Sequence, residues 1–102
     1  MNEFNFSSLD EIRTNIDNID KEIVFLLSRR GECVKHAARF KTTAAHVRDL
    51  QRLEQIIEKV TSYAKEIGFD SLTTEIIYRN MIEAFIQLEM KTYAELKESN
   101  VI

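Results

Sequence analysis

Two basic residues stand out because they occur where apolar side chains are expected. Arg30 and Lys41 lie 11 positions apart, about three helical turns, so on one helix they would point in the same direction. Cations on a buried face are costly unless they are paired. They are either neutralised by acids such as Asp20 or Glu54, or they face a cavity that binds an anion. The apolar residues that surround them have helical spacing: Leu9, Ile12, Ile16, Ile19, Ile23, Leu26, Leu27, Val34 and Ala37.

Glu89 is a similar anomaly of opposite charge. It lies inside an apolar arc, where an unpaired carboxylate is unfavourable. In a structural interpretation it forms an ion pair with Arg30 or Lys41. In a functional interpretation it is protonated when a ligand binds, and it donates a hydrogen bond to a ligand oxygen. The residues of the arc are Ile77, Met81, Ile82, Phe85, Ile86 and Leu88.

Two further arginines are candidates for the same site. Arg13 lies at the edge of the first apolar stripe, 17 positions before Arg30, which is about 26 Å along a helix. It could therefore reach a small site near Arg30 only from a second chain related by a twofold axis. Arg52 flanks the apolar stripe of the next segment, and both a solvated and a functional role are open for it.

The sequence predicts an all-α protein with three helices. It contains no Pro and only two Gly, which favours long helices. The first helix, 8–41, begins with a capping box at Ser8. The second, 47–67, ends at Gly68, and the third, 71–96, is capped by Asp70 or Ser71. The first helix would be about 50 Å long, so it needs a partner to cover its apolar face, and we expect one domain, 1–102, that forms an intertwined helical homodimer.

Composition excludes several classes of function. A net charge of −3 without a basic run argues against nucleic-acid binding. Cys33 is the only cysteine, and no His/Asp/Glu cluster has ligand spacing, so we expect no metal site and a packing role for the thiol. No apolar run approaches the roughly 20 residues of a membrane span. Residues 1–8 lack the basic and apolar blocks of a signal peptide, so a cytoplasmic location is expected.

Taken in order, five segments resemble the all-helical (AroQ-class) chorismate mutase superfamily. Each segment is weakly specific alone, but their order and spacing over about Leu9–Tyr93 are specific. The segments are Leu9-Asp10-Glu11-Ile12-Arg13, Ile16 to Asp20, Leu26-Leu27-Ser28-Arg29-Arg30, Ala38-Arg39-Phe40-Lys41, and Val47-Arg48-Asp49 with Arg52.

The resemblance implies a homodimer with two sites, each built from both chains, and no cofactor. The substrate would be a dianion, chorismate or isochorismate, which carries an enolpyruvyl ether. Arg13 of the partner chain would clamp one carboxylate, and Arg30 would hold the other with help from Arg52. Lys41 would reach the ether oxygen and a carboxylate, and Glu89 would form a hydrogen bond with the ether oxygen. The catalytic residues would then be Lys41, Glu89 and Arg30.

The resemblance leaves two reactions open. We favour an isochorismate pyruvate-lyase that forms salicylate and pyruvate, with secondary chorismate mutase activity. Leu53 stands where bacterial mutases usually carry Glu, and Ala38-Arg39-Phe40-Lys41 with Thr42-Thr43 looks like the lyase. Glu89 instead resembles certain mutases, since the lyase is expected to have Gln there. The alternatives are a chorismate mutase that forms prephenate, a non-catalytic metabolite-binding dimer, and a plain dimerisation domain in which the buried charges neutralise one another.

Overall fold

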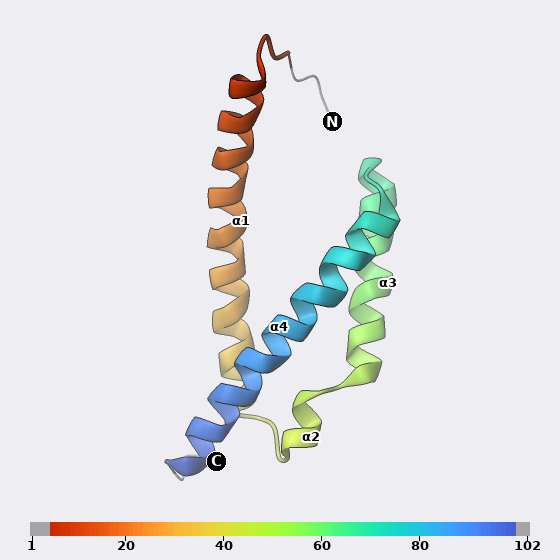
Figure 1. Cartoon of the computed structure of the whole chain (residues 1–102). Coiled ribbons are helices and arrows are strands. Elements are labelled where there is room, and N and C mark those ends of the chain that lie inside the picture. Colours follow the sequence, from red (N-terminus) through yellow and green to blue (C-terminus); the bar gives the residue numbers. More distant parts are fainter. Residues whose placement is uncertain (1–4, 100–102) are drawn as a thin grey trace.

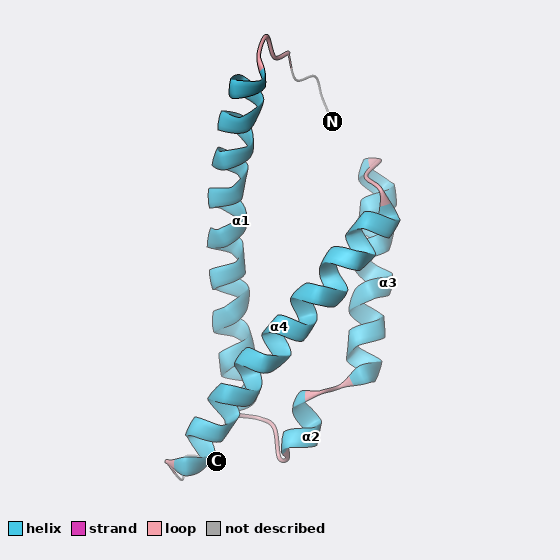
Figure 2. Ribbon diagram, viewed as in Figure 1, coloured by secondary structure: helices cyan, strands magenta, loops and turns pink. Residues whose placement is uncertain are grey.

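The computed structural model describes residues 5–99, which form four α-helices joined by short connections (Figures 1 and 2). They are α1 (Leu9–Ala38), α2 (Ala44–Val47), α3 (Leu50–Ile67) and α4 (Ser71–Glu98). Residues 5–99 contain no β-strand. The predicted all-α class is therefore confirmed, and the three long predicted helices correspond to α1, α3 and α4.

Helix α1 begins at the predicted cap. The Ser8 hydroxyl accepts a hydrogen bond from the backbone N–H of Glu11 at 3.1 Å. The Glu11 carboxylate accepts one from the backbone N–H of Ser7 at 2.7 Å, so the reciprocal half of the capping box is displaced by one residue. These hydrogen bonds, above all that from the Ser7 hydroxyl, hold the pKa of Glu11 below its ordinary value.

The predicted end of the first helix at residue 41 is wrong, since α1 ends at Ala38. The N–H groups of Arg39, Phe40 and Lys41 donate to carbonyl groups three residues back, at 3.2, 3.0 and 3.3 Å. This tighter pattern closes the last turn without Gly or Pro. Lys41 therefore belongs to the connection after α1 and does not lie on a helical face shared with Arg30.

The predicted loop 42–46 and the predicted start of the second helix at Val47 also need correction. Thr43 caps the short helix α2 by accepting a hydrogen bond from His46 N–H at 3.2 Å, and Val47 is the last residue of α2. Helix α3 starts only at Leu50, because Asp49 caps it by accepting from Arg52 N–H at 3.0 Å. Val47 is buried in the core, so this short turn is held by packing.

The turn between α3 and α4 follows the prediction closely. Gly68 has φ 77°, a left-handed conformation that favours glycine, and it ends α3. Asp70 caps α4 by accepting from Thr73 N–H at 2.8 Å, and α4 runs to Glu98, two residues beyond the predicted end. Hydrogen bonds from Thr73 hold the pKa of Asp70 below its ordinary value.

Helix α4 is the centre of the fold. It packs along α3, crosses the C-terminal part of α1 and also contacts α2 (Figure 1). Gly31 is buried on α1 opposite the α4 residues Phe85 and Leu88. The hydrophobic core therefore forms between α4 and the parts of α1, α2 and α3 that pack on it: Ala38, Val47, Ile57, Ile82, Ile86 and Tyr93.

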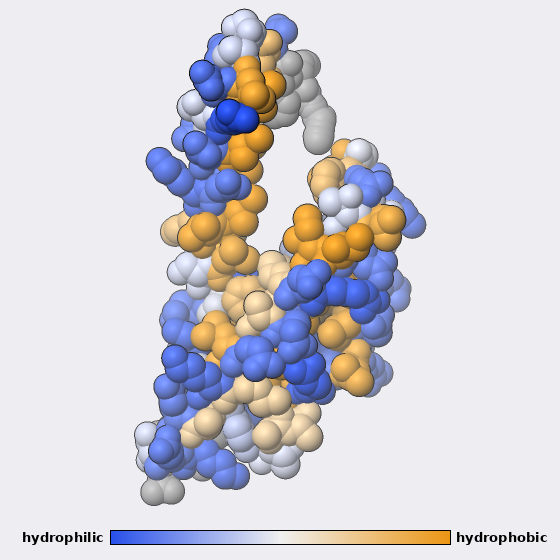
Figure 3. Space-filling view, viewed as in Figure 1, coloured by the Kyte–Doolittle hydropathy of each residue, from blue (hydrophilic) through white to orange (hydrophobic). Residues whose placement is uncertain are grey.

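The N-terminal half of α1 projects away from the other helices, which gives the chain dimensions of 57 × 25 × 15 Å (Figure 1). Most of the predicted apolar stripe is consequently exposed, because it is not covered by other parts of residues 5–99. Figure 3 shows this hydrophobic band on the side of α1 that faces the α3–α4 turn. We call it the α1 stripe; its exposed members are Leu9, Ile16, Ile19, Ile23 and Leu26.

A second exposed apolar surface surrounds the turn between α3 and α4. It lies across the open space from the α1 stripe (Figure 3). We call it the hairpin surface; it consists of Tyr63, Ile67, Phe69, Leu72, Ile76 and Ile77. Two exposed apolar surfaces of this extent are unusual for a protein that acts as a monomer.

Candidate functional site

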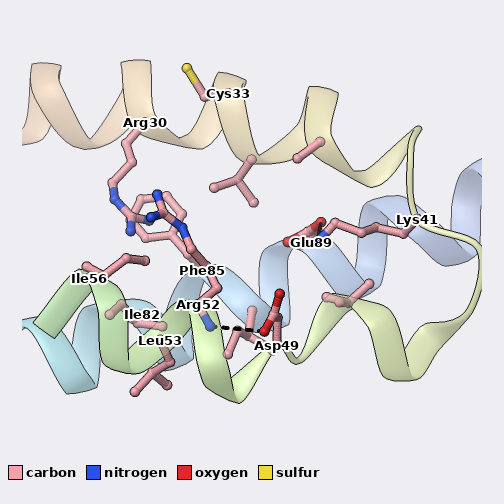
Figure 4. A pocket seen from close by; sticks show the side chains of 14 residues that line it. Arg30, Cys33, Lys41, Asp49, Arg52, Leu53, Ile56, Ile82, Phe85 and Glu89 are labelled. Carbon is pink, nitrogen blue, oxygen red and sulfur yellow. Dashed lines mark hydrogen bonds and ion pairs between the residues drawn. The ribbon is translucent and has the colours of Figure 1, made fainter.

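A pocket of about 330 Å³ lies where α4 meets the end of α1 and the start of α3 (Figure 4). Four of the predicted site residues line it, namely Arg30, Lys41, Arg52 and Glu89. The fifth, Arg13, does not. Asp49 is the remaining charged residue of the lining, so three basic and two acidic side chains meet here. Apolar side chains complete the walls: Val34, Ala37, Val47, Leu53, Ile56, Ile82, Phe85 and Ile86.

One end of the pocket holds an ion pair. The Nζ atom of Lys41 lies 3.1 Å from Oε2 of Glu89, and the side chains are only 18% and 9% exposed. Lys41 Nζ also donates a long hydrogen bond of 3.5 Å to the carbonyl oxygen of His46. The ion pair does not have hydrogen-bond geometry, so Oε2 of Glu89 is buried without a hydrogen-bond partner in the described structure. The structural interpretation of Glu89, in which it forms an ion pair with Lys41, is thus correct.

The other end of the pocket is formed by two arginines. The Cζ atom of Arg30 lies 4.6 Å from the centroid of the Phe85 ring, a cation–π contact. Arg52 comes from the first turn of α3, and Figure 4 shows both arginine side chains reaching toward this ring. Within residues 5–99 neither guanidinium group forms an ion pair with a carboxylate.

The acids that could have neutralised Arg30 lie elsewhere. Glu54 forms an ion pair with Arg79 at 3.0 Å, and this contact holds the pKa of Glu54 below its ordinary value. Asp20 is exposed on the projecting half of α1. The hypothesis that Asp20 or Glu54 neutralises Arg30 is therefore wrong. The charge of Arg30 is not balanced by either acid.

Arg13 does not line the pocket. It is exposed on the N-terminal half of α1. Its 17-residue separation from Arg30 on the same continuous helix corresponds to about 26 Å, which its side chain cannot cross within one chain. Its role in a site shared with a second chain stays a prediction.

Three lining residues were missed or placed differently by the sequence analysis. Asp49 was not predicted as a site residue; it falls inside the predicted helix 47–67 but is the N-cap of α3. Phe85 was counted only as an apolar core residue. Cys33 was expected to pack in the core, but it is exposed and lines the pocket. The spacing of four residues between Phe85 and Glu89 was the available signal, since it places both on one face of α4.

A surface ion pair near the pocket joins the connection between α2 and α3 to α4. Arg48, between α2 and α3, donates to both carboxylate oxygens of Glu83 on α4, at 2.7 and 2.9 Å. Gln87 donates to the same carboxylate at 2.9 Å. These hydrogen bonds, led by those from Arg48, lower the pKa of Glu83 from 4.5 to about 2. The bidentate contact ties the connection between α2 and α3, which contains Asp49, to the helix that carries Glu89.

Over residues 5–99, no three His, Cys, Asp or Glu side chains are arranged to hold a metal ion. None of the helices described here combines the length and the apolar character needed to cross a membrane. The cytoplasmic location stays a prediction, and residues 1–4 of the N-terminal segment used for it lie outside the described residues.

Together, these features define a class of site. Paired guanidinium groups bind carboxylates in a forked geometry, and an ammonium group binds a further anionic or ether oxygen. Apolar walls between them accommodate a ring. Such a pocket suits a small, ring-containing molecule with two negative charges.

Comparison with known proteins agrees with a pocket for a small dianion that contains a ring. Residues 12–90 match the chorismate mutase type II family. The chain is 31% identical over 91 residues to the isochorismate pyruvate lyase of Pseudomonas aeruginosa, which covers 89% of this chain and 90% of that protein. It is 36% identical over 89 residues to the bifunctional chorismate mutase/prephenate dehydratase of Aquifex aeolicus, and 29% identical over 86 residues to that of Buchnera aphidicola.

The two bifunctional relatives are much longer proteins. The matches cover 81% and 83% of this chain but only 24% and 22% of those relatives. The family match, by contrast, includes every charged residue of the pocket, from Arg30 to Glu89. The chain belongs to the chorismate mutase type II family, and it is a chorismate mutase-family enzyme.

Proposed function

We propose that this protein is an isochorismate pyruvate-lyase that forms salicylate and pyruvate, with secondary chorismate mutase activity. The observation that carries the proposal is the pocket with two arginines at one end and the Lys41–Glu89 pair at the other. The relative named isochorismate pyruvate lyase supports the choice of reaction, since its similarity extends over 90% of its length.

In the proposed complex, the pocket orients both carboxylates of the substrate. Arg30 holds one carboxylate in a forked contact, and Arg52 assists from α3. Lys41 has donors left beside Glu89 and His46, and it uses them for the ether oxygen and a carboxylate. The apolar walls press the enolpyruvyl arm over the ring, so that the reacting atoms are already close.

The lyase reaction needs no covalent intermediate. The hydrogen on the ring carbon that bears the hydroxyl moves to the methylene carbon of the enolpyruvyl group while the ether C–O bond breaks. The ring becomes aromatic as salicylate, and the side chain leaves as pyruvate. Negative charge develops on the ether oxygen, and donors aimed at that atom lower the barrier. Lys41 supplies one donor, and Glu89 forms a second hydrogen bond with the ether oxygen.

A chorismate mutase that forms prephenate is the second candidate. It is favoured by Glu89, which resembles certain mutases, and by the two relatives whose names include that activity. Against it, the apolar Leu53 lines the pocket at the position where bacterial mutases usually carry Glu. Both reactions would use the same cations and the same ether-oxygen donors.

The active form is proposed to be a homodimer. In such a dimer, the α1 stripe of each chain would pack against the hairpin surface of the other chain. A twofold axis repeats this contact, so both exposed apolar surfaces would be covered on both chains. The same arrangement would bring Arg13 of one chain toward the pocket of the other. Arg13 would then clamp the second substrate carboxylate.

A product assay with both substrates tests the function. Purified protein should convert isochorismate to salicylate and pyruvate in equal amounts, and chorismate to prephenate more slowly. Faster formation of prephenate would favour the mutase. Binding of chorismate without any product would favour a non-catalytic metabolite-binding dimer. A plain dimerisation domain requires all buried charges to be paired and no cavity, and that condition is not met over residues 5–99.

A further inference from the structure

We infer that Phe85 is a positioning residue that holds the Arg30 guanidinium in its anion-binding orientation before the ligand arrives. The inference rests on the proposed function, because it concerns the residue proposed to hold a substrate carboxylate. Arg30 and Phe85 both line the pocket, and the guanidinium Cζ lies 4.6 Å from the ring centroid. Within the described chain this is the contact that fixes the end of the Arg30 side chain.

The ring can hold the cation without competing with the ligand. A carboxylate partner would occupy the forked N–H donors of Arg30, and a substrate would have to displace it. An aromatic face instead contacts the flat side of the guanidinium and leaves the N–H edge free. Phe85 therefore restricts a flexible side chain, which lowers the conformational entropy lost when the anion binds.

Helix α4 makes this arrangement rigid. Phe85 and Glu89 are four residues apart on α4, so the helix fixes the ring under Arg30 relative to the carboxyl group beside Lys41. The ring also faces α1 at Gly31, where a built Cβ atom would lie in ordinary van der Waals contact with Cε1 of Phe85, at 3.5 Å. The two ends of the pocket are thus set by one face of one helix.

A double-mutant cycle tests the inference, with prephenate as the dianionic probe and titration calorimetry as the measurement. Phe85→Leu keeps an apolar side chain but removes the ring, and it should weaken binding about 3- to 30-fold. In an Arg30→Ala background, Phe85→Leu should have almost no further effect, because the ring acts through Arg30. Phe85→Tyr retains the aromatic face and should stay within about twofold of the unmodified protein. Effects of equal size in both backgrounds would overturn the inference.

Two further readouts separate positioning from packing. In the lyase assay, Phe85→Leu should raise KM more than it lowers kcat, since the guanidinium still reaches the carboxylate once it is ordered. By NMR, the ring current of Phe85 should shift the Arg30 Nε–H proton upfield in the free protein and still do so with prephenate bound. Loss of that shift on binding would mean that Arg30 leaves the ring, and the inference would be wrong whether or not Phe85→Leu folds.

The outcomes distinguish this inference from the proposed function. If the effects of Phe85→Leu and Arg30→Ala on prephenate binding add, but the protein converts isochorismate to salicylate, only the positioning role is overturned. If the two effects do not add, and the protein binds prephenate but turns over neither substrate, the positioning role is supported and the lyase function is overturned.

Discussion

The ammonium group of Lys41 lies 3.1 Å from Oε2 of Glu89, yet this buried oxygen makes no hydrogen bond in the described structure. The pair joins the connection after α1 to the face of α4. The contact fixes the ammonium group of Lys41 relative to α4, so the two groups that are proposed to meet the ether oxygen are held beside each other.

The first prediction concerns Glu89. If its side chain forms a hydrogen bond with the ether oxygen, Glu89→Ala should lose about 100-fold in kcat in the product assay. Glu89→Gln keeps the length of the side chain and carries an amide N–H donor, so it should retain activity. Equal losses of kcat in the two variants would contradict the role of Glu89.

The second prediction compares two adjacent arginines. Arg30→Ala should lower kcat/KM by about 100-fold or more, about 3 kcal/mol, because a carboxylate loses its forked partner. Arg29 is exposed and does not line the pocket, so Arg29→Ala is the matched control and should keep nearly full activity. Circular dichroism should show unchanged helix content for both variants. Equal activity of the two variants would mean that the assigned pocket is wrong.

The third prediction tests whether two chains share each site. Arg13→Ala and Arg30→Ala should each be inactive alone. After unfolding and refolding together, half of the dimers should be mixed, and each mixed dimer should contain one site with both arginines intact. Activity should therefore return to about a quarter of the normal value. If no activity returns although mixed dimers form, Arg13 and Arg30 do not act in one site from different chains.

The fourth prediction concerns acid stability. The pKa of Glu83 falls from 4.5 to about 2 because Arg48 holds its ionised form. A lowered pKa in the folded state means that this contribution to the free energy of unfolding is complete above about pH 4.5 and disappears as pH falls toward 2. Urea unfolding should show Glu83→Gln less stable than the unmodified protein at pH 6 and equally stable near pH 2.

Glu66→Gln is the control for that experiment, since Glu66 is exposed and forms no ion pair within residues 5–99. It should change the urea midpoint little at either pH. A pH-independent difference between Glu83→Gln and the unmodified protein would show that the Arg48 contact is not the cause.

Much of the fold follows from local sequence signals. The caps at Ser8, Gly68 and Asp70 are found as predicted, because capping depends on side-chain and backbone chemistry within a few residues. The end of α1 was misplaced because no Gly or Pro marks it. The short helix α2 was missed because its four residues are held by the burial of Val47, and that contact is between distant parts of the chain.

Site residues could be predicted from the sequence where a charged residue occupies a position at which the helical pattern expects an apolar one. Arg30 and Glu89 stand out because each interrupts an apolar helical face. Lys41 was singled out on a face that α1 does not extend to, yet all three residues line one pocket. Phe85 interrupts nothing, so an apolar pattern gives no sign that its ring contacts a cation. Asp49 could not be placed either, since its direction depends on whether α3 begins before or after it. The pairing of Arg13 with a pocket remains a prediction.

The projecting half of α1 also has a consequence for how the protein must be handled. With its α1 stripe uncovered, an isolated chain gains little from keeping that part of the helix folded, so folding and association are expected to be coupled. The thermal midpoint should then rise with protein concentration, and specific activity should fall on dilution below the dissociation constant. At a single protein concentration, a low specific activity caused by dissociation of the dimer could not be distinguished from a low kcat.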